Sequence, residues 1–266
     1  MLNYKQQVID FFNKRTTYDQ EGQKHPREAK LLLNSVPIIS EQKILDMATG
    51  TGLVAIPAAK KVKERGSVIG VDISSVMLAQ AQSKIIAEGL NNIELIEADL
   101  ESIDFDTQQF DVIFCCSAIT YIIDITRIFK LCYDWLKIGG YFAFTCPYKT
   151  AYMAEIKVKV CKDLWKINLP HINEPLWTPQ KCYFLLNEVG FENIEVEIDR
   201  SGRYVNSDYA YAWNGWDFYP RGNPLVNLSQ EEKSKLQREY KKAIKELITK
   251  QGIWQDSTTL YVKACK

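Results

Sequence analysis

The sequence predicts one α/β domain built around a doubly wound, mostly parallel sheet. Short runs rich in β-branched and aromatic residues alternate with helical stretches from about residue 40 to residue 147. Two later segments, 193–198 and 258–264, alternate apolar and polar residues as strands do. Repeated strand–helix units of this length require right-handed parallel crossovers, which build an open sheet with helices on both faces.

Five segments of the first half have the length and composition of strands. They are residues 43–47, 67–72, 92–97, 110–116 and 141–146. The first two carry acids at or near their ends, Asp46 and Asp72. The fourth is an apolar run of the kind found in strands that are buried on both faces. Together with the two later segments, these five predict a seven-stranded sheet.

The helices expected between the strands are marked by signals at their ends. They are residues 53–61, 75–87, 122–136 and 178–189. Segment 75–87 is amphipathic, with Ser74 or Ser75 as its N-cap and Gly89 just past its end. Gly190 closes segment 178–189 in the same way.

The rest of the chain predicts helical lid insertions over the sheet. Residues 200–256 hold an aromatic stretch, a turn rich in glycine and proline, and an amphipathic helix over about 229–250. Ser229 and Glu232 form the capping-box pattern at the start of that helix. We therefore expect a single domain over residues 1–266. Its parts are an N-terminal cap (1–25), a ligand-binding core (40–147) and a substrate lid (148–177 and 200–256).

Composition argues against several classes of protein. Lysine plus arginine and aspartate plus glutamate both total 33, so the formal net charge is zero. A nucleic-acid binder usually has a basic surplus, so we expect no nucleic-acid partner. No apolar run reaches the roughly 18 residues of a membrane span, and the N-terminus lacks the apolar core of a signal peptide. The seven cysteines form no C-x-x-C pair, which predicts reduced thiols in a cytoplasmic protein without a metal site.

The strongest functional signal follows the first strand. The glycines of Gly50-x-Gly52 let the backbone turn sharply and leave room for a ligand at the carboxyl end of the strand. Together with Ala55 they also fit the dinucleotide fingerprint, in which Asp72 would bind the ribose of NAD. An NAD-dependent oxidoreductase is therefore one interpretation of the motif.

Two acids favour S-adenosylmethionine over NAD. Asp46 lies just before the glycines, where a fixed anion disfavours a pyrophosphate but favours an ammonium and a sulfonium group. Asp99, after the third strand, is suited to accept a hydrogen bond from an adenine amino group. A module that binds S-adenosylmethionine without catalysing a reaction is a third interpretation.

Five segments, in order, resemble the motifs of the class I S-adenosylmethionine-dependent methyltransferases. They are residues 45–52, 68–74 with Met77-Leu78, 98–99, 110–113 and 136–140. The likeness covers roughly residues 10–147 and is to the small-molecule enzymes akin to the ubiquinone/menaquinone methyltransferase group. It implies a Rossmann-like sheet whose last strand is antiparallel, and methyl transfer from S-adenosylmethionine.

The resemblance also implies which residues bind the cofactor. They are Asp46, Ala48, Thr49, Gly50, Gly52, Asp72, Ile73, Met77, Ala98, Asp99, Leu100, Cys116 and Ser117. Asp46 would reach the methionine end partly through water, Asp72 would take the two ribose hydroxyls, and Asp99 would meet the adenine. Ala48 stands where the family commonly has a glycine.

Two tyrosines are our candidates for catalytic residues that face the methyl group. Tyr18 follows an N-terminal helix in a segment that closes over the cofactor in related enzymes, and an aromatic face attracts a sulfonium. Thr120 and Tyr121 stand where relatives often carry histidines. His25 and His171 are the only histidines, and either could be a general base, but we expect a surface or structural role for both.

The acceptor is expected to be a small molecule or a short peptide. The aromatic stretch 204–219 suits an acceptor with apolar or ring character. Three nearby arginines, Arg200, Arg203 and Arg221, could hold a carboxylate. O-, N- and C-methylation all stay open at this point, with a slight preference for a carboxylate oxygen, which needs no base.

Overall fold

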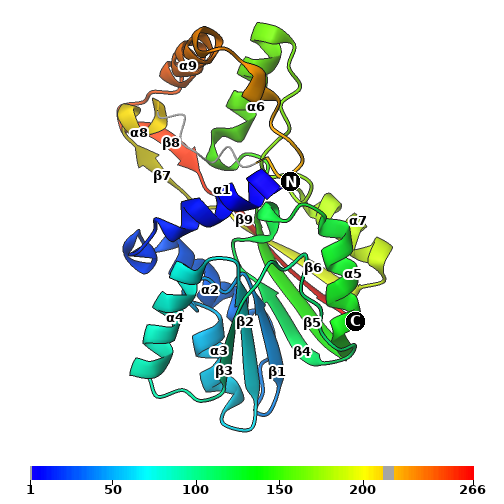
Figure 1. The fold of residues 1–266 in the computed structure, drawn as a ribbon. Coiled ribbons are helices and arrows are strands. Elements are labelled where there is room, and N and C mark those ends of the chain that lie inside the picture. The colour runs from blue at the N-terminus through cyan, green and yellow to red at the C-terminus, as the bar shows by residue number, and fades with distance from the viewer. Residues whose placement is uncertain (1, 212–218) are drawn as a thin grey trace.

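The computed structural model describes residues 2–211 and 219–266 and contains the predicted seven-stranded sheet (Figure 1). The strands lie in the order β3-β2-β1-β4-β5-β9-β6. They are β1 (Lys43–Met47), β2 (Ser67–Asp72), β3 (Ile93–Glu97), β4 (Phe110–Cys115), β5 (Leu136–Pro147), β6 (Glu192–Asp199) and β9 (Thr259–Cys265). β9 runs antiparallel to both β5 and β6, and the other neighbours are parallel. The predicted fold class is therefore confirmed.

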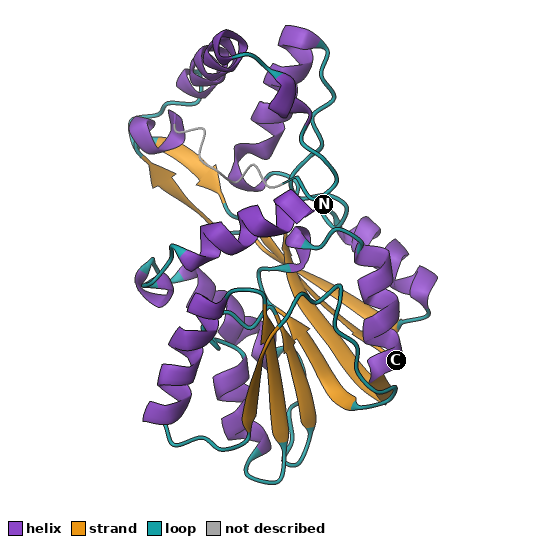
Figure 2. Cartoon of the chain, viewed as in Figure 1, coloured by secondary structure: helices purple, strands orange, loops and turns teal. Residues whose placement is uncertain are grey.

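Helices bury both faces of this sheet (Figure 2). The described residues form these helices, including those of the lid: α1 (Leu2–Asn13), α2 (Lys24–Asn34), α3 (Ala55–Val62), α4 (Ser75–Ala87), α5 (Ile125–Trp135), α6 (Ala154–Trp165), α7 (Pro179–Val189), α8 (Ser207–Tyr211) and α9 (Gln230–Lys245). Successive residues of β4 point to opposite faces. Phe114 packs in the cluster that includes α2 and α3, whereas Ile113 packs in the cluster that includes α5 and α7. The fourth strand is thus buried on both sides.

Several element boundaries differ from the predicted ones, and side chains at the ends explain two of them. α3 starts at Ala55, because Gly52 still has a φ of +79° and belongs to the loop. α5 starts at Ile125, because the Asp124 carboxylate caps it by accepting a hydrogen bond from the Arg127 backbone N–H at 2.9 Å. The predicted N-cap of α4 is Ser74, whose side chain accepts from the Met77 N–H.

The lid contains more structure than the sequence indicated. α6 lies within residues 148–177, and a hairpin-like pair, β7 (Gly202–Val205) and β8 (Ile253–Asp256), joins the two ends of the insertion. The predicted capping box is present at α9, but the helix ends at Lys245, about one turn before residue 250. In Figure 1, α6, α8, α9 and this pair form a group beyond α1, away from the main sheet. Three residues of the aromatic stretch lie outside the described residues, namely Trp213, Trp216 and Phe218.

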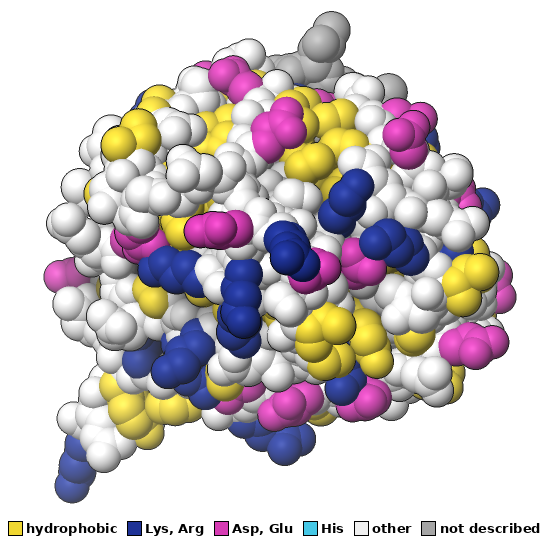
Figure 3. Space-filling view, turned by 90° about the horizontal axis from the view of Figure 1, so that it is seen from below, with side chains coloured by type: hydrophobic (Ala, Val, Ile, Leu, Met, Phe, Trp, Pro, Cys, Tyr) yellow, Lys and Arg dark blue, Asp and Glu magenta, His cyan; other side chains and the backbone are white. Residues whose placement is uncertain are grey.

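The face of the molecule that is seen from below the view of Figure 1 has no strong excess of either charge. Figure 3 shows basic and acidic side chains intermixed there, in keeping with the zero formal charge. Across the described ranges, no helix combines the length and the apolar character needed to cross a membrane.

Candidate functional site

The loop after β1 has three residues with positive φ. They are Ala48 (φ +54°), Gly50 (φ +55°) and Gly52 (φ +79°). A side chain at Gly50 would meet no atom within 4 Å, so this part of the loop faces open space. At Gly52 a Cβ would lie 3.0 Å from the Ile56 side chain, so this glycine packs against α3. Ala48, which stands where the family commonly has a glycine, thus adopts a conformation that costs an L-residue energy.

Asp46, in β1, is hydrogen-bonded to both ends of this loop. Its carboxylate accepts hydrogen bonds from the Thr49 hydroxyl at 2.6 Å and from the Ala55 backbone N–H at 3.0 Å. The residue is only 1% exposed, and this burial raises the pKa of the carboxyl to about 7. Asp46 thus stabilises the loop and, when ionised, places a negative charge at the cavity wall.

Asp72, at the end of β2, ties the second strand to the same loop. One carboxylate oxygen accepts from the Gly50 N–H at 2.8 Å, and the other accepts from the Ser74 N–H at 2.8 Å. Burial raises the pKa of this carboxyl, while the backbone hydrogen bonds lower it. Each oxygen keeps a further lone pair, so the carboxylate can still accept from a ligand.

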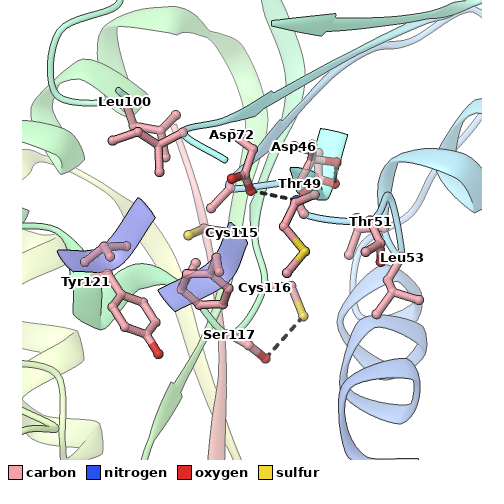
Figure 4. A pocket seen from close by; sticks show the side chains of 18 of the residues that line it. Asp46, Thr49, Thr51, Leu53, Asp72, Leu100, Cys115, Cys116, Ser117 and Tyr121 are labelled. Carbon is pink, nitrogen blue, oxygen red and sulfur yellow. Dashed lines mark hydrogen bonds between the residues drawn. The ribbon is translucent and has the colours of Figure 1, made fainter. Parts of the chain in front are cut away.

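These residues border a cavity at the carboxyl ends of β1, β2 and β4. It encloses about 1040 Å³ of space, open mouth included. Every residue predicted to bind the cofactor, except Gly52, lines it. Both predicted catalytic tyrosines, Tyr18 and Tyr121, also line it. Figure 4 shows Asp72 and Leu100 on one side of the cavity and Cys116 and Ser117 on the other.

The N-terminal segment covers this cavity as a cap and is bonded to the core at several points. Lys5 forms ion pairs with Asp99, at 2.9 Å, and with Glu101. The Ser74 hydroxyl donates to the Asn13 side chain at 2.7 Å. Near the end of the cap, Asp19 accepts from the Thr51 hydroxyl at 2.5 Å and pairs with Lys84 at 2.6 Å. The cap is therefore attached to the loops after β1, β2 and β3.

A second cavity adjoins the first. It encloses about 720 Å³, open space included, and shares five lining residues with the first cavity: Phe12, Tyr18, His25, Ser117 and Tyr121. We call these five residues the neck. Burial raises the pKa of the Tyr18 and Tyr121 hydroxyls above the ordinary range, so both stay protonated. Two tyrosines from distant parts of the chain thus flank the passage between the cavities.

The sequence interpretation underestimated His25. Its ring stacks on Tyr18 with 4.9 Å between centroids, and its Nδ1 lies 3.8 Å from a Glu28 oxygen. Burial lowers the pKa of this imidazole to about 4, so the ring is neutral at pH 7. His171 fits the structural role expected of it: it is buried in the lid beside Trp177, and its Nδ1 accepts from the Asn173 N–H at 3.2 Å.

Glu28 is a site residue that sequence reasoning missed. This carboxylate of α2 is 3% exposed, lines the second cavity and accepts from the Ser117 hydroxyl at 2.6 Å and the Thr259 hydroxyl at 2.7 Å. Burial acts to raise its pKa, but the adjacent Lys24 and the two hydroxyls together lower it, so the group stays ionised. Glu28 follows Lys24 by four positions, a spacing that is also typical of surface ion pairs, so the pattern alone did not reveal a buried charge.

The lid residues proposed to contact an acceptor are only partly at the site. Arg203 and Tyr209 line a third cavity, which adjoins the second. Arg200 is exposed, and Arg221 donates to the Glu174 carbonyl at 2.7 Å; neither lines any of the cavities described here. Tyr204 packs edge-on to Trp254 on the β7–β8 pair.

The chain is similar to proteins of known family. A model of the methyltransferase domain matches residues 44–140. Aklanonic acid methyltransferase of Streptomyces sp. strain C5 is 33% identical over 148 residues, which cover 54% of this chain and 67% of the relative. A ubiquinone/menaquinone biosynthesis C-methyltransferase of Rickettsia prowazekii is 35% identical over 153 residues, 54% of this chain and 59% of the relative.

Solved structures share the fold. Phosphoethanolamine N-methyltransferase 2 of Haemonchus contortus, in complex with S-adenosyl-L-methionine, matches with a TM-score of 0.55 at 21% identity. That match covers 90% of this chain and 52% of the other chain. The strand order also differs from the 3-2-1-4-5-6 order of the dinucleotide-binding fold, because β9 is inserted between β5 and β6.

Proposed function

The chain belongs to the S-adenosylmethionine-dependent methyltransferase family, and we propose that it methylates a small organic acceptor bound in the second cavity. The observation that carries the proposal is the neck. Tyr18, Tyr121 and the three other shared residues separate two cavities of different character. Methyl transfer needs a donor and an acceptor aligned at van der Waals distance with water excluded, which is what two adjoining cavities provide.

The first cavity is lined by hydrogen-bond acceptors that suit S-adenosylmethionine. We assign Asp72, which keeps lone pairs for a vicinal diol, to the ribose, and Asp99, which also pairs with Lys5, to the adenine amino group. The acid Asp46 suits the positive methionine end. The space in front of Gly50 is free of side chains, so a ligand can approach the backbone closely. When bound, the cofactor supplies a methyl group already activated by its sulfonium.

The second cavity supports an acceptor that reacts at a neutral atom. Its two cationic side chains are already paired, Arg15 with Glu21 and Lys24 with Glu28. A carboxylate at the neck would find no uncompensated cation there, and burying an unpaired anion is costly. This argument moves our preference from a carboxylate oxygen, favoured slightly by the sequence, to a hydroxyl, an amine or an activated carbon.

His25 suits such an acceptor. A hydroxyl or an amine loses a proton on methylation, and the neutral imidazole at the neck is able to accept it. Tyr18 and Tyr121 keep their protons, so we assign them to shaping the passage and shielding the methyl group. The catalytic contribution we propose for this chain is therefore mainly positional.

Incubation of a metabolite extract with radiolabelled S-adenosylmethionine tests the proposal. We expect the label in a small molecule. Label mainly in RNA, DNA or large proteins would contradict the small-molecule acceptor, and a base-labile product would restore the carboxylate ester. Calorimetry with S-adenosylhomocysteine and NAD, run separately, tests the first cavity: only the former is expected to bind.

We also infer a cytoplasmic location from the thiols. The described residues form no disulfide, and five of the seven cysteines are buried. The Sγ atoms of Cys146 and Cys182 lie 3.9 Å apart without a bond. Reduced thiols this close are typical of a reducing compartment. Labelling of intact cells with a membrane-permeant alkylating reagent, followed by denaturation and a second reagent, would count the thiols that stay reduced.

A further inference from the structure

A third cavity continues the path from the neck toward the lid. It shares Arg15, Lys24, His25 and Tyr152 with the second cavity. His25 therefore lines all three cavities and lies at their junction. The outer wall comes from the β7–β8 pair, through Arg203 and Gln255. An acceptor longer than the second cavity would extend into this space.

The charged side chains around the third cavity are mostly basic. Among the described residues, five cations and one acid line it: Arg15, Lys24, Arg27, Lys157, Arg203 and Glu21. Three of the cations are compensated, since Arg15 pairs with Glu21, Lys24 with Glu28 and Arg27 with Asp199. Lys157 is buried and also has a partner. Arg203 therefore contributes to the surplus of positive charge around this cavity.

Arg203 is held in place without being neutralised. It lies opposite Gln255 on the β7–β8 pair, and its Nε donates to the Gln255 side chain at 3.4 Å. Its guanidinium lies over the Tyr209 ring, 5.0 Å from the centroid. It forms no ion pair within residues 2–211 and 219–266, so its terminal nitrogens can meet a ligand. A guanidinium oriented in this way suits the paired oxygens of a carboxylate or a phosphate.

From this arrangement we infer that the third cavity is an oxyanion subsite that binds an acidic group of the acceptor, remote from the atom that is methylated. The inference rests on the proposed function, because it names the class of acceptor: an elongated molecule with a carboxylate or a phosphate at its far end. Its acidic group binds at Arg203, and its reacting atom lies at the neck beside Tyr18 and His25. The acid keeps its charge through the reaction, so the methylated product still carries a carboxylate or a phosphate.

Binding of simple anions to the intact chain tests the subsite apart from catalysis. Inorganic phosphate and acetate are titrated separately by calorimetry into protein saturated with S-adenosylhomocysteine. We expect binding to weaken about tenfold or more in Arg203→Gln, the effect of losing hydrogen bonds to a charged group, and to be unchanged in Arg200→Gln. Arg200 is the matched control, because it is exposed and lies outside the three cavities. Tighter binding of phosphate or of acetate identifies the kind of acid.

Two results would overturn the subsite: no binding of either anion by the wild-type protein, or equal binding by the wild-type protein and Arg203→Gln. Thermal unfolding and S-adenosylhomocysteine affinity show whether the variant is folded. The labelled product gives an independent readout. A product that bears a carboxylate or a phosphate, as mass spectrometry of the labelled compound shows, and that mild base does not cleave supports the inference, whereas a product with neither group overturns it. Anion binding that depends on Arg203 without any methyl transfer would mean that the proposed function has failed while the subsite stands.

Discussion

The carboxylate of Asp72 accepts a hydrogen bond from the backbone N–H of Gly50 at 2.8 Å, which links the end of β2 to the loop after β1. We propose that the same carboxylate, which lines the first cavity, binds the ribose of the cofactor. We expect Asp72→Ala to weaken S-adenosylhomocysteine binding by about 1.5–3 kcal/mol, the scale of lost hydrogen bonds to a charged group. Calorimetry measures the change. Glu97→Gln is the control, because Glu97 pairs with Asp72 in the sheet register but lies outside the cavity. Equal affinity in both variants would remove Asp72 from the cofactor site.

The raised pKa of Asp46 predicts a pH-dependent affinity. At pH 7 this buried acid is about half protonated, since its pKa is about 7. The positive cofactor favours the ionised form, so binding at lower pH must also remove a proton. We expect S-adenosylmethionine affinity to fall as the pH decreases from about 8 to about 6, and this dependence to disappear in Asp46→Asn. Isothermal titration in buffers of different ionisation enthalpy counts the released protons.

The same pKa has the opposite consequence for the cofactor-free protein. The folded state binds more protons than the unfolded state between the ordinary carboxyl pKa of 3.8 and about 7. The contribution of Asp46 to stability is therefore lost as the pH rises through this range. Asp46→Asn should flatten that part of the curve of unfolding free energy against pH, and an unchanged curve would contradict the assigned pKa.

The buried Glu28 predicts a large loss of stability on substitution. Glu28→Gln removes the negative charge that compensates Lys24. It also replaces the carboxylate that accepts hydrogen bonds from the Ser117 and Thr259 hydroxyls. We expect a loss of about 2 kcal/mol in the free energy of unfolding, less than for a fully buried pair because Lys24 is partly exposed. Urea denaturation gives the value. Glu88→Gln breaks the exposed pair with Lys60 and should cost about 0.5 kcal/mol or less.

Ala48 and Gly50 predict opposite responses to exchanging glycine and alanine. Both residues have φ near +55°, a conformation that costs an L-residue about 1 kcal/mol. Ala48→Gly should therefore raise the melting temperature, whereas Gly50→Ala should lower it. The methyl group added at Gly50 also enters the cavity, so this variant should bind S-adenosylhomocysteine less tightly. Differential scanning calorimetry with and without the ligand separates the two effects.

Tyr18 separates a role of the ring from a role of the hydroxyl. The hydroxyl stays protonated and the ring packs between His25 and Arg15, so we expect the ring to matter more. Tyr18→Phe should keep kcat/KM within about threefold, whereas Tyr18→Ala should lower it about 100-fold through lost alignment. The rate at which each variant forms labelled product from the extract fraction that contains the acceptor gives the relative kcat/KM. A Phe variant as inactive as the Ala variant would assign the hydroxyl to catalysis, and Tyr121→Phe repeats the test at the other side of the neck.

The main sheet and the cofactor cavity were predictable because their signals are local. Each strand of the first half is a short apolar run, and the predicted cofactor residues lie at or just after the ends of strands that parallel topology brings to one edge. The β7–β8 pair could not be predicted in this way. Its strands are separated by nearly fifty residues. Gly202 pairs with Asp256, and the ring of Trp254 occupies the space that a side chain at Gly202 would need.

The acceptor side depended on contacts between distant residues. Glu28 becomes a site residue only because Ser117, just after β4, and Thr259, at the start of β9, meet it there. His25 precedes a proline in a polar stretch, which is typical of the surface, and only the folded chain stacks its ring on Tyr18 beside Glu28. Arg200 and Arg203 looked equivalent in the sequence, but only Arg203 lies in β7, where it faces Gln255 and lines a cavity.

The position of β9 between β5 and β6 has a consequence for synthesis of the chain. β6 has no direct pairing with β5, so it can join the main sheet only after residues 259–265 have been made. More than one hundred residues separate the end of β5 from the start of β9. At about 5–20 residues per second, the edge of β5 stays unpaired for roughly 5–20 s on the ribosome. Such an edge is a template for pairing with other chains, so the nascent protein is exposed to aggregation until its last strand is in place.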